Sequence, residues 1–217
     1  MFDLLTSIYA PHTCLGCETE GAILCSECAA AISYPAPRCY RCHTLATEAR
    51  TCRSCRPASR LFRVQVAAEY TQRNKDLVKQ LKFAGNRSVA AILAERMSYL
   101  LTAAADTLIV PVPTATGRVR LRGYDQSVLI ARSLAAASDL PYCPALLRSG
   151  QQRQLGARRQ DRLQQMQQSF VLHKEVSGRS IVLIDDVITT GATLEAAALC
   201  LRQAGARRIE ALVYARA

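Results

Sequence analysis

One stretch of the chain, residues 181–194, decides the fold, and it reads IVLIDDVITTGATL. Its first four residues are apolar, a short continuous run of the kind found in parallel strands that are buried on both faces. Two carboxylates, Asp185 and Asp186, follow directly, and a loop rich in threonine then leads into an alanine-rich helix. The pattern predicts a strand, a turn and a helix, with the acids at the carboxyl end of the strand, where ligands bind in open α/β sheets.

The loop after the two acids has the chemistry of a phosphate site. A helix N-terminus offers free N–H groups and a partial positive charge, and both suit a phosphate. The candidate phosphate-binding residues are Thr189, Thr190, Gly191, Ala192 and Thr193. Two adjacent carboxylates are costly to desolvate without partners, which sugar hydroxyls and a hydrated Mg²⁺ would supply. The alternative is a plain helix start with Thr caps and nothing bound. A Walker-type loop is excluded, because no Gly-Lys-Ser/Thr follows.

Strands and helices alternate outward from this stretch, beginning at Leu61. The periodicity of apolar residues predicts strands at residues 64–70, 107–112, 181–184 and 208–214. It predicts helices at residues 76–83, 89–101, 125–137 and 192–204. Alternation of this kind implies right-handed βαβ units, so the predicted fold class is α/β, a parallel sheet flanked by helices.

The N-terminal part of the chain is dominated by cysteine. Eight of the ten cysteines form four Cys-x-x-Cys pairs, Cys14/Cys17, Cys25/Cys28, Cys39/Cys42 and Cys52/Cys55. A Cys-x-x-Cys turn directs two thiolates at one ion, and two such turns complete a tetrahedral site. The four pairs therefore predict two structural Zn²⁺ sites, in sequential or crossed order, because spacing alone does not fix the pairing. All ligands are protein side chains, so neither predicted zinc has an open position for catalysis.

Two other uses of these cysteines fit the sequence less well. A disulfide scaffold would need an oxidising compartment, and the start of the chain, with an acid and no Lys or Arg in residues 1–14, is a poor signal peptide. An iron–sulfur protein would carry the ferredoxin cysteine run and its proline, which are missing here. The longest apolar stretch, residues 97–112, is interrupted by polar residues and does not predict a membrane span. We therefore expect a cytoplasmic zinc protein with no membrane partner.

The composition suggests two domains of unequal size. A segment as short and as poor in apolar residues as 1–60 could not fold alone without metal, so we expect a double zinc ribbon there. The larger α/β domain would occupy residues 61–217. The whole chain of 217 residues carries a formal net charge of +11, which makes phosphate-bearing partners attractive electrostatically.

The stretch at 181–194 resembles the phosphoribosyl-pyrophosphate (PRPP) motif of type I phosphoribosyltransferases. The resemblance implies that Asp185 and Asp186 hold the ribose hydroxyls, that residues 189–193 hold the 5′-phosphate, and that Mg²⁺ binds with PRPP. Two further motifs narrow the match, Val110-Pro111-Val112-Pro113 and Arg122-Gly123-Tyr124-Asp125-Gln126-Ser127. With the four cysteine pairs, nearly the whole chain is similar to the ComF/GntX family, competence-associated proteins with a phosphoribosyltransferase-like domain.

The resemblance also assigns roles to residues outside the acidic strand. It implies a type I phosphoribosyltransferase-like domain at 61–217, and a pyrophosphate loop made of Thr114, Ala115, Thr116 and Gly117. Arg118 and Arg122 would add bidentate contacts to the pyrophosphate; the alternative is a solvated charged edge. The arginine-rich region from Arg148 to Arg162 would form a flexible hood, and its alternatives are a nucleic-acid contact or a solvated helix face. Lys82 matches a family position, although a snorkelling helix lysine fits it almost equally well.

Two functions follow, and the sequence leaves both open. The first is a phosphoribosyltransferase that binds PRPP with Mg²⁺ and transfers the pentosyl group to an acceptor that the sequence does not identify. The second is a binding module without turnover, which uses the phosphate pocket and the basic surface on single-stranded DNA or on a competence or DNA-processing protein. Family members are cytoplasmic, and some are needed for natural transformation, which places either function in DNA uptake.

Overall fold

A four-stranded parallel sheet organises the chain, as seen in a computed structural model that describes residues 12–104, 106–149 and 169–217. The strands are β1 (Val64–Glu69), β2 (Thr107–Pro111), β5 (Ser180–Ile188) and β6 (Arg208–Arg216), in the order β1-β6-β5-β2. The two inner strands are the longest and are almost wholly buried, as a parallel sheet covered on both faces requires. The α/β fold class expected from the sequence is confirmed.

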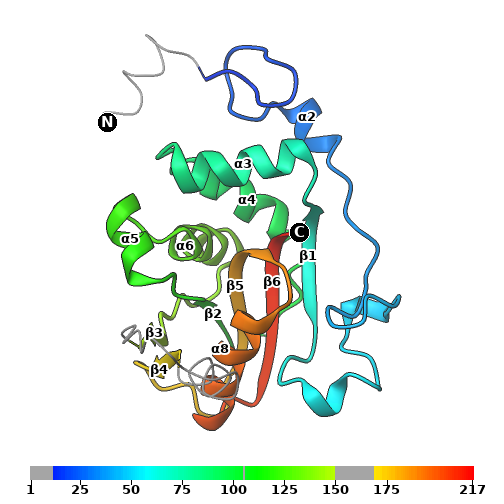
Figure 1. Cartoon of the computed structure of the whole chain (residues 1–217), viewed down its shortest axis with the longest axis vertical. Helices are drawn as coiled ribbons and strands as arrows, with labels where there is room; N and C mark the ends of the chain where they lie inside the picture. Colours follow the sequence, from blue (N-terminus) through cyan, green and yellow to red (C-terminus); the bar gives the residue numbers. More distant parts are fainter. Residues whose placement is uncertain (1–11, 105, 150–168) are drawn as a thin grey trace, which may run out of the picture.

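Helices cover one face of the sheet. They are α3 (Gln72–Phe83), α4 (Val89–Ser98) and α6 (Gln126–Ser138), and their buried side chains form one apolar cluster with Val182 and Ile184 of β5. The other face carries α8 (Ala192–Gln203) and the antiparallel pair β3 (Leu146–Arg148) and β4 (Phe170–Leu172). The short α5 (Thr116–Arg122) lies beside α6, at the margin of the sheet (Figure 1). The acidic strand is thus the centre of a three-layered domain.

The expected elements are all present, with differences at their ends. β5 continues to Ile188 instead of ending at residue 184, because β6 supplies parallel partners for Asp185 and Val187. α3 begins at Gln72 instead of residue 76. Its first turn is fixed by Asn74, whose amide donates to the carbonyl of Glu69 over 2.8 Å and accepts from the buried hydroxyl of Tyr214 over 2.9 Å. The bond to Glu69 is local, whereas the bond from Tyr214 is a tertiary contact, and hydrophobic periodicity encodes neither.

The cysteine-rich segment is attached to both faces of the α/β domain. It contains α2 (Ser26–Ala30) and the 3₁₀ turns η1 (Thr47–Ala49) and η2 (Arg56–Ala58), and in Figure 1 it passes above α3 and then descends beside β1. Ile23 and Ile32 join the apolar cluster of α3, α4 and α6, whereas Tyr40 joins the cluster on the α8 face. Each half of the segment therefore has its own anchor. No helix among the described residues is long and apolar enough to span a bilayer.

Candidate functional site

Two carboxylates lie side by side at the carboxyl end of β5. Asp185 is half-buried and accepts hydrogen bonds from the hydroxyl of Ser127 over 3.0 Å and from the backbone N–H of Asp186 over 2.9 Å. Burial, and next the charge of Asp186, raise the pKa of Asp185 well above its ordinary value. Ser127 stands in the first turn of α6, so this helix orients the first acid.

The second acid is held from another direction. Asp186 is buried, and its Oδ2 atom forms an ion pair with Nζ of Lys82 in the last turn of α3. That oxygen has no hydrogen-bond partner among the described residues apart from this ionic contact. A buried carboxylate needs such a countercharge, because the loss of its hydration is otherwise uncompensated. Of the two interpretations of Lys82, the structure favours the site position over the snorkelling lysine.

The loop after β5 makes a tight turn into α8. Gly191 has φ +78°, in the left-handed region, and α8 begins at the next residue. Three threonine hydroxyls line the approach, and Thr189, Thr190 and Thr193 are all exposed. Free N–H groups and hydroxyls thus gather next to the acids, which is the arrangement that a phosphate group requires.

The second half of the cysteine-rich segment presses against this loop. The ring of Tyr40, which follows Cys39, is buried, and a Cβ atom at Gly191 would lie 2.9 Å from it. The Tyr40 hydroxyl exchanges a hydrogen bond with Ser59 over 2.7 Å and donates to Glu195 in the first turn of α8. Glu195 also accepts from the backbone N–H of Arg60 over 3.1 Å. Gly191 is therefore required both for its backbone angle and for the approach of Tyr40.

The expected pyrophosphate loop lies at the end of β2 and is tied to α6. The N–H and hydroxyl of Thr114 donate to the carboxylate of Asp125 over 2.7 and 3.0 Å, and Asp125 also caps α6 through the N–H of Ser127. The backbone N–H of Thr114 is therefore engaged within the protein. Ala115 is half-buried, whereas Thr116 and Gly117 are exposed. The chain Thr114–Asp125–Ser127–Asp185 connects the two loops that the sequence analysis assigned to one ligand.

The arginines expected at the site are placed differently from one another. Arg118 is exposed near the loop, whereas Arg122 is half-buried, with its guanidinium 5.0 Å from the ring centre of Phe83 and donating to Gln126 over 2.9 Å. Arg162 lies outside the described residues.

Arg148 lies near the acidic pair. It lies on β3 and donates to the carbonyl of Pro113 over 3.3 Å, and burial and then the charge of Arg118 lower its pKa. Its interactions with Asp185 and Asp125 act in the opposite direction, which places it within electrostatic reach of the acidic pair. The sequence placed Arg148 only within the arginine-rich region expected to be a flexible hood, a nucleic-acid contact or a solvated helix face, because the pairing of β3 with β4 across a long separation has no local signal.

The eight cysteines form two compact clusters in the sequential order. One comprises Cys14, Cys17, Cys25 and Cys28, and the other comprises Cys39, Cys42, Cys52 and Cys55. Within each cluster the four sulfur atoms lie within 4.8 Å of one another, as a tetrahedral metal site needs. The pKa of Cys14 is lowered to about 6, mainly because its sulfur accepts a hydrogen bond from the backbone N–H of Cys25. The pKa of Cys52 is also lowered to about 6, mainly by a hydrogen bond with the Ser54 hydroxyl. These thiols readily supply the thiolate form that zinc binds.

We predict that the purified protein holds two zinc ions per chain. Changing Cys42→Ser should leave one, because the second cluster then has three thiolates and the first is intact. Metal content by mass spectrometry measures this, and Cys143→Ser is the control, since Cys143 belongs to neither cluster. Retention of two ions by the Cys42→Ser protein would contradict the assignment.

Tyr40 should contribute strongly to stability. The change Tyr40→Ala removes a buried ring and should lower the free energy of unfolding of the zinc-loaded protein by about 3–5 kcal/mol. Tyr40→Phe keeps the ring but loses the hydrogen bond to Glu195, and should cost about 1.5–3 kcal/mol. Urea unfolding measures both, with Tyr99→Ala as control because the Tyr99 side chain is 74% exposed. Equal losses in the Tyr40→Ala and Tyr99→Ala proteins would contradict the anchoring role.

The chain is similar to known proteins over most of its length. The phosphoribosyl transferase domain family matches residues 90–217. DNA utilization protein YhgH of Salmonella typhimurium is 30% identical over 208 residues, which cover 91% of this chain and 86% of that protein. Competence protein F of Haemophilus influenzae is 29% identical over 219 residues, which cover 94% of this chain and 90% of that protein. Competence protein ComFC of Bacillus subtilis is 30% identical over 139 residues, which cover 63% of this chain and 56% of that protein. With its two four-cysteine clusters and its phosphoribosyl transferase domain, the chain belongs to the ComF family.

Proposed function

We propose that this protein binds PRPP together with Mg²⁺ at the carboxyl ends of β5 and β2 and transfers its phosphoribosyl group to an acceptor. The observation that carries the proposal is the convergence of the half-buried Asp185, the buried Asp186, the Gly191 turn and the start of α8 at one edge of the sheet. Acids, hydroxyls and free N–H groups are the donors and acceptors that a ribose 5-phosphate needs. The phosphoribosyl transferase domain supports the same substrate class.

Each group of the site would then have a definite task. Asp185 and Asp186 accept hydrogen bonds from the ribose hydroxyls, and Ser127 and Lys82 hold the two carboxylates in place. Thr189, Thr190 and Thr193, with the N–H groups at the start of α8, hold the 5′-phosphate. The exposed Thr116, Gly117 and Arg118 face the pyrophosphate. Carboxylate oxygens suit Mg²⁺, which when bound neutralises charge on the departing pyrophosphate.

The transfer itself needs no covalent protein intermediate. The bond between C1 of the ribose and the pyrophosphate oxygen breaks, and the electron pair leaves with the pyrophosphate. The acceptor forms the new bond to C1 and loses a proton to solvent. The protein contributes position and electrostatic stabilisation of the developing charge. Arg148, within reach of Asp185, is placed to stabilise negative charge at this edge.

The biological setting of the proposal is the uptake or use of DNA. Relatives that span most of this chain are described as a DNA utilization protein and a competence protein. We infer the same setting here, and with it the zinc-loaded form of the two cysteine clusters as the active form.

Calorimetric titration of the zinc-loaded protein with PRPP tests the proposal. We expect micromolar binding that requires Mg²⁺. Asp185→Asn should weaken it at least tenfold, because the change removes the charge and one acceptor from the pair. Asp139→Asn is the matched control, since Asp139 is an exposed residue at the far end of α6. Absence of binding in the folded wild-type protein, or normal binding by the Asp185→Asn protein, would refute the assignment.

Binding should also release protons. In the free protein, burial and next the charge of Asp186 raise the pKa of Asp185 above its ordinary value, so its carboxyl group holds a proton up to a higher pH than an ordinary aspartate. Mg²⁺ favours the ionised carboxylate, which lowers that pKa, and the proton must leave. The apparent affinity should therefore rise with pH through the range in which Asp185 titrates. Calorimetry in buffers of different ionisation enthalpy counts the released protons, and an affinity that falls with pH would oppose the mechanism.

A further inference from the structure

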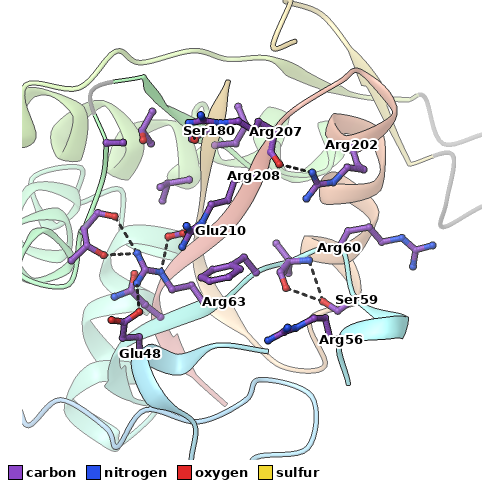
Figure 2. A pocket seen from close by; sticks show the side chains of 18 residues that line it. Glu48, Arg56, Ser59, Arg60, Arg63, Ser180, Arg202, Arg207, Arg208 and Glu210 are labelled. Carbon is purple, nitrogen blue, oxygen red and sulfur yellow. Dashed lines mark hydrogen bonds and ion pairs between the residues drawn. The ribbon is translucent and has the colours of Figure 1, made fainter. Parts of the chain in front are cut away.

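A second concave site lies at the opposite edge of the sheet. It is a groove of about 930 Å³ whose floor includes the amino ends of three strands, at Thr107, Ser180 and Arg208. Its walls are formed by η2, the residues that follow it, and the last turns of α8 (Figure 2). Four residues of β5 lie between Ser180 and Asp185, which are therefore roughly 16 Å apart along an extended strand. The groove is therefore separate from the acidic pair and from the loops beside it.

The groove is strongly basic. Six of its lining residues are arginines, Arg56, Arg60, Arg63, Arg202, Arg207 and Arg208, against two carboxylates, Glu48 and Glu210. They come from η2, α8, β6 and the connections between them, so several separate elements contribute cationic residues to the lining (Figure 2). Clustered arginines on the walls of a cleft concentrate positive potential within it. This is the electrostatic footprint of a site for phosphates.

Part of this charge serves the fold. The buried Glu210 accepts a hydrogen bond from Arg63 over 2.6 Å and forms an ion pair with Arg208, also over 2.6 Å, and Arg63 lies 3.6 Å from Glu48 (Figure 2). Arg207 pairs with Asp106 over 2.5 Å. These three arginines are thus held in place by carboxylates. Arg208 still has an exposed side chain, so it is positioned by Glu210 and open to the cavity.

The other three arginines have no carboxylate partner in the described part of the chain. Arg202 donates to the carbonyl oxygens of Ala206 and Arg207, both neutral acceptors. Arg56 and Arg60 are exposed, and their side chains form no ion pair among the described residues. The groove therefore keeps an excess of positive charge after its internal pairs are counted. That excess is available to an anionic ligand.

An aromatic ring lies among these cations. Phe62 is half-buried, its backbone N–H is fixed by the carbonyl of Ile209 over 2.8 Å, and the guanidinium carbon of Arg208 lies 3.7 Å from its ring centre. Arg50 lies 5.2 Å from the same ring centre. Such a stack presents flat guanidinium surfaces, on which bases stack, beside groups that contact phosphates. An aromatic ring interleaved with arginines is typical of grooves that follow a single strand.

We propose that this groove binds a single strand of nucleic acid through its backbone phosphates, with Phe62 and Arg208 as the stacking surface. The planar fork of arginine matches phosphate oxygens in a bidentate manner, and the spread of arginines over several elements matches a repeating charge. The proposal does not depend on PRPP binding, because the groove and the acidic pair share no residue. It gives the molecule a strand-holding surface distinct from its phosphoribosyl site.

Fluorescence anisotropy tests the proposal with the full-length zinc-loaded protein and a labelled oligothymidylate of about 15 nucleotides. We expect affinity that falls steeply between roughly 50 and 200 mM salt. The double change Arg56→Gln and Arg60→Gln should weaken binding roughly tenfold or more. It should also lower the slope of log K against log salt by about 1.4, at about 0.7 for each phosphate contact.

Matched measurements separate this site from the alternatives. Arg87→Gln with Arg132→Gln removes the same charge from exposed positions outside the groove and should leave binding within about twofold of the wild type. Zinc content and the urea unfolding midpoint should match the wild type in the Arg56/Arg60 variant, which shows that it is folded. A parallel titration with an oligouridylate of the same length compares RNA with DNA, and binding of either strand supports the phosphate contacts.

Four results would overturn the proposal. The first is no binding of either strand by the wild-type protein at low salt. The second is an equal loss in the two double variants, which would mean that net charge alone acts. The third is unchanged binding by the Arg56/Arg60 variant with displacement by PRPP, which would place the strand at the acidic pair. The fourth is equally effective displacement by polyglutamate of the same charge, which would indicate an acidic polypeptide as the ligand.

Discussion

Two neighbouring carboxylates at the end of a buried strand destabilise the folded protein unless polar partners replace their lost hydration, and the residues around them supply such partners. Asp185 accepts a hydrogen bond from Ser127 of α6, and Asp186 forms an ion pair with Lys82 of α3. Each helix thus contributes a polar group to the site in addition to its apolar face in the core. Because a buried carboxylate without partners is strongly destabilising, the positions of both helices and of the strand are coupled. The same need for partners is what makes this edge receptive to hydroxyls and a cation.

The cysteine-rich segment is part of this arrangement through one aromatic side chain. Tyr40 follows a cysteine of the second cluster directly, and its ring closes over Gly191 while its hydroxyl reaches Glu195. A metal in that cluster would restrict the backbone that carries the ring, and the ring in turn restricts the loop beside the acids. Within residues 12–104, 106–149 and 169–217, the first cluster makes no such contact, and its segment is anchored through Ile23 and Ile32 on the helical face. The second cluster is therefore linked to the site through Tyr40, whereas the first is linked to the helices on the other face.

Local patterns were sufficient for the framework of the fold. The apolar run ending in Asp185 and Asp186 and the alternation around it predicted the parallel sheet, since strand and helix periodicities differ and each is short-range. The paired spacing of the cysteines likewise predicted two clusters, and the structure selects the sequential grouping. Element ends were less accurate. The start of α3 depends on the contact between Asn74 and Tyr214, and the length of β5 depends on its pairing with β6; both contacts join distant segments.

The sequence by itself determined the fold class, the two cysteine clusters and the identity of the acidic strand and its loop, because each is written in neighbouring residues with a characteristic spacing. Only the tertiary structure brought Lys82 to Asp186, Tyr40 to Gly191 and Arg148 to the edge of the site. It alone gathered six arginines from separate elements into one groove. These tertiary contacts join residues that are far apart in the chain. Their geometry is set by how the helices pack on a twisted sheet, which no local sequence pattern indicates.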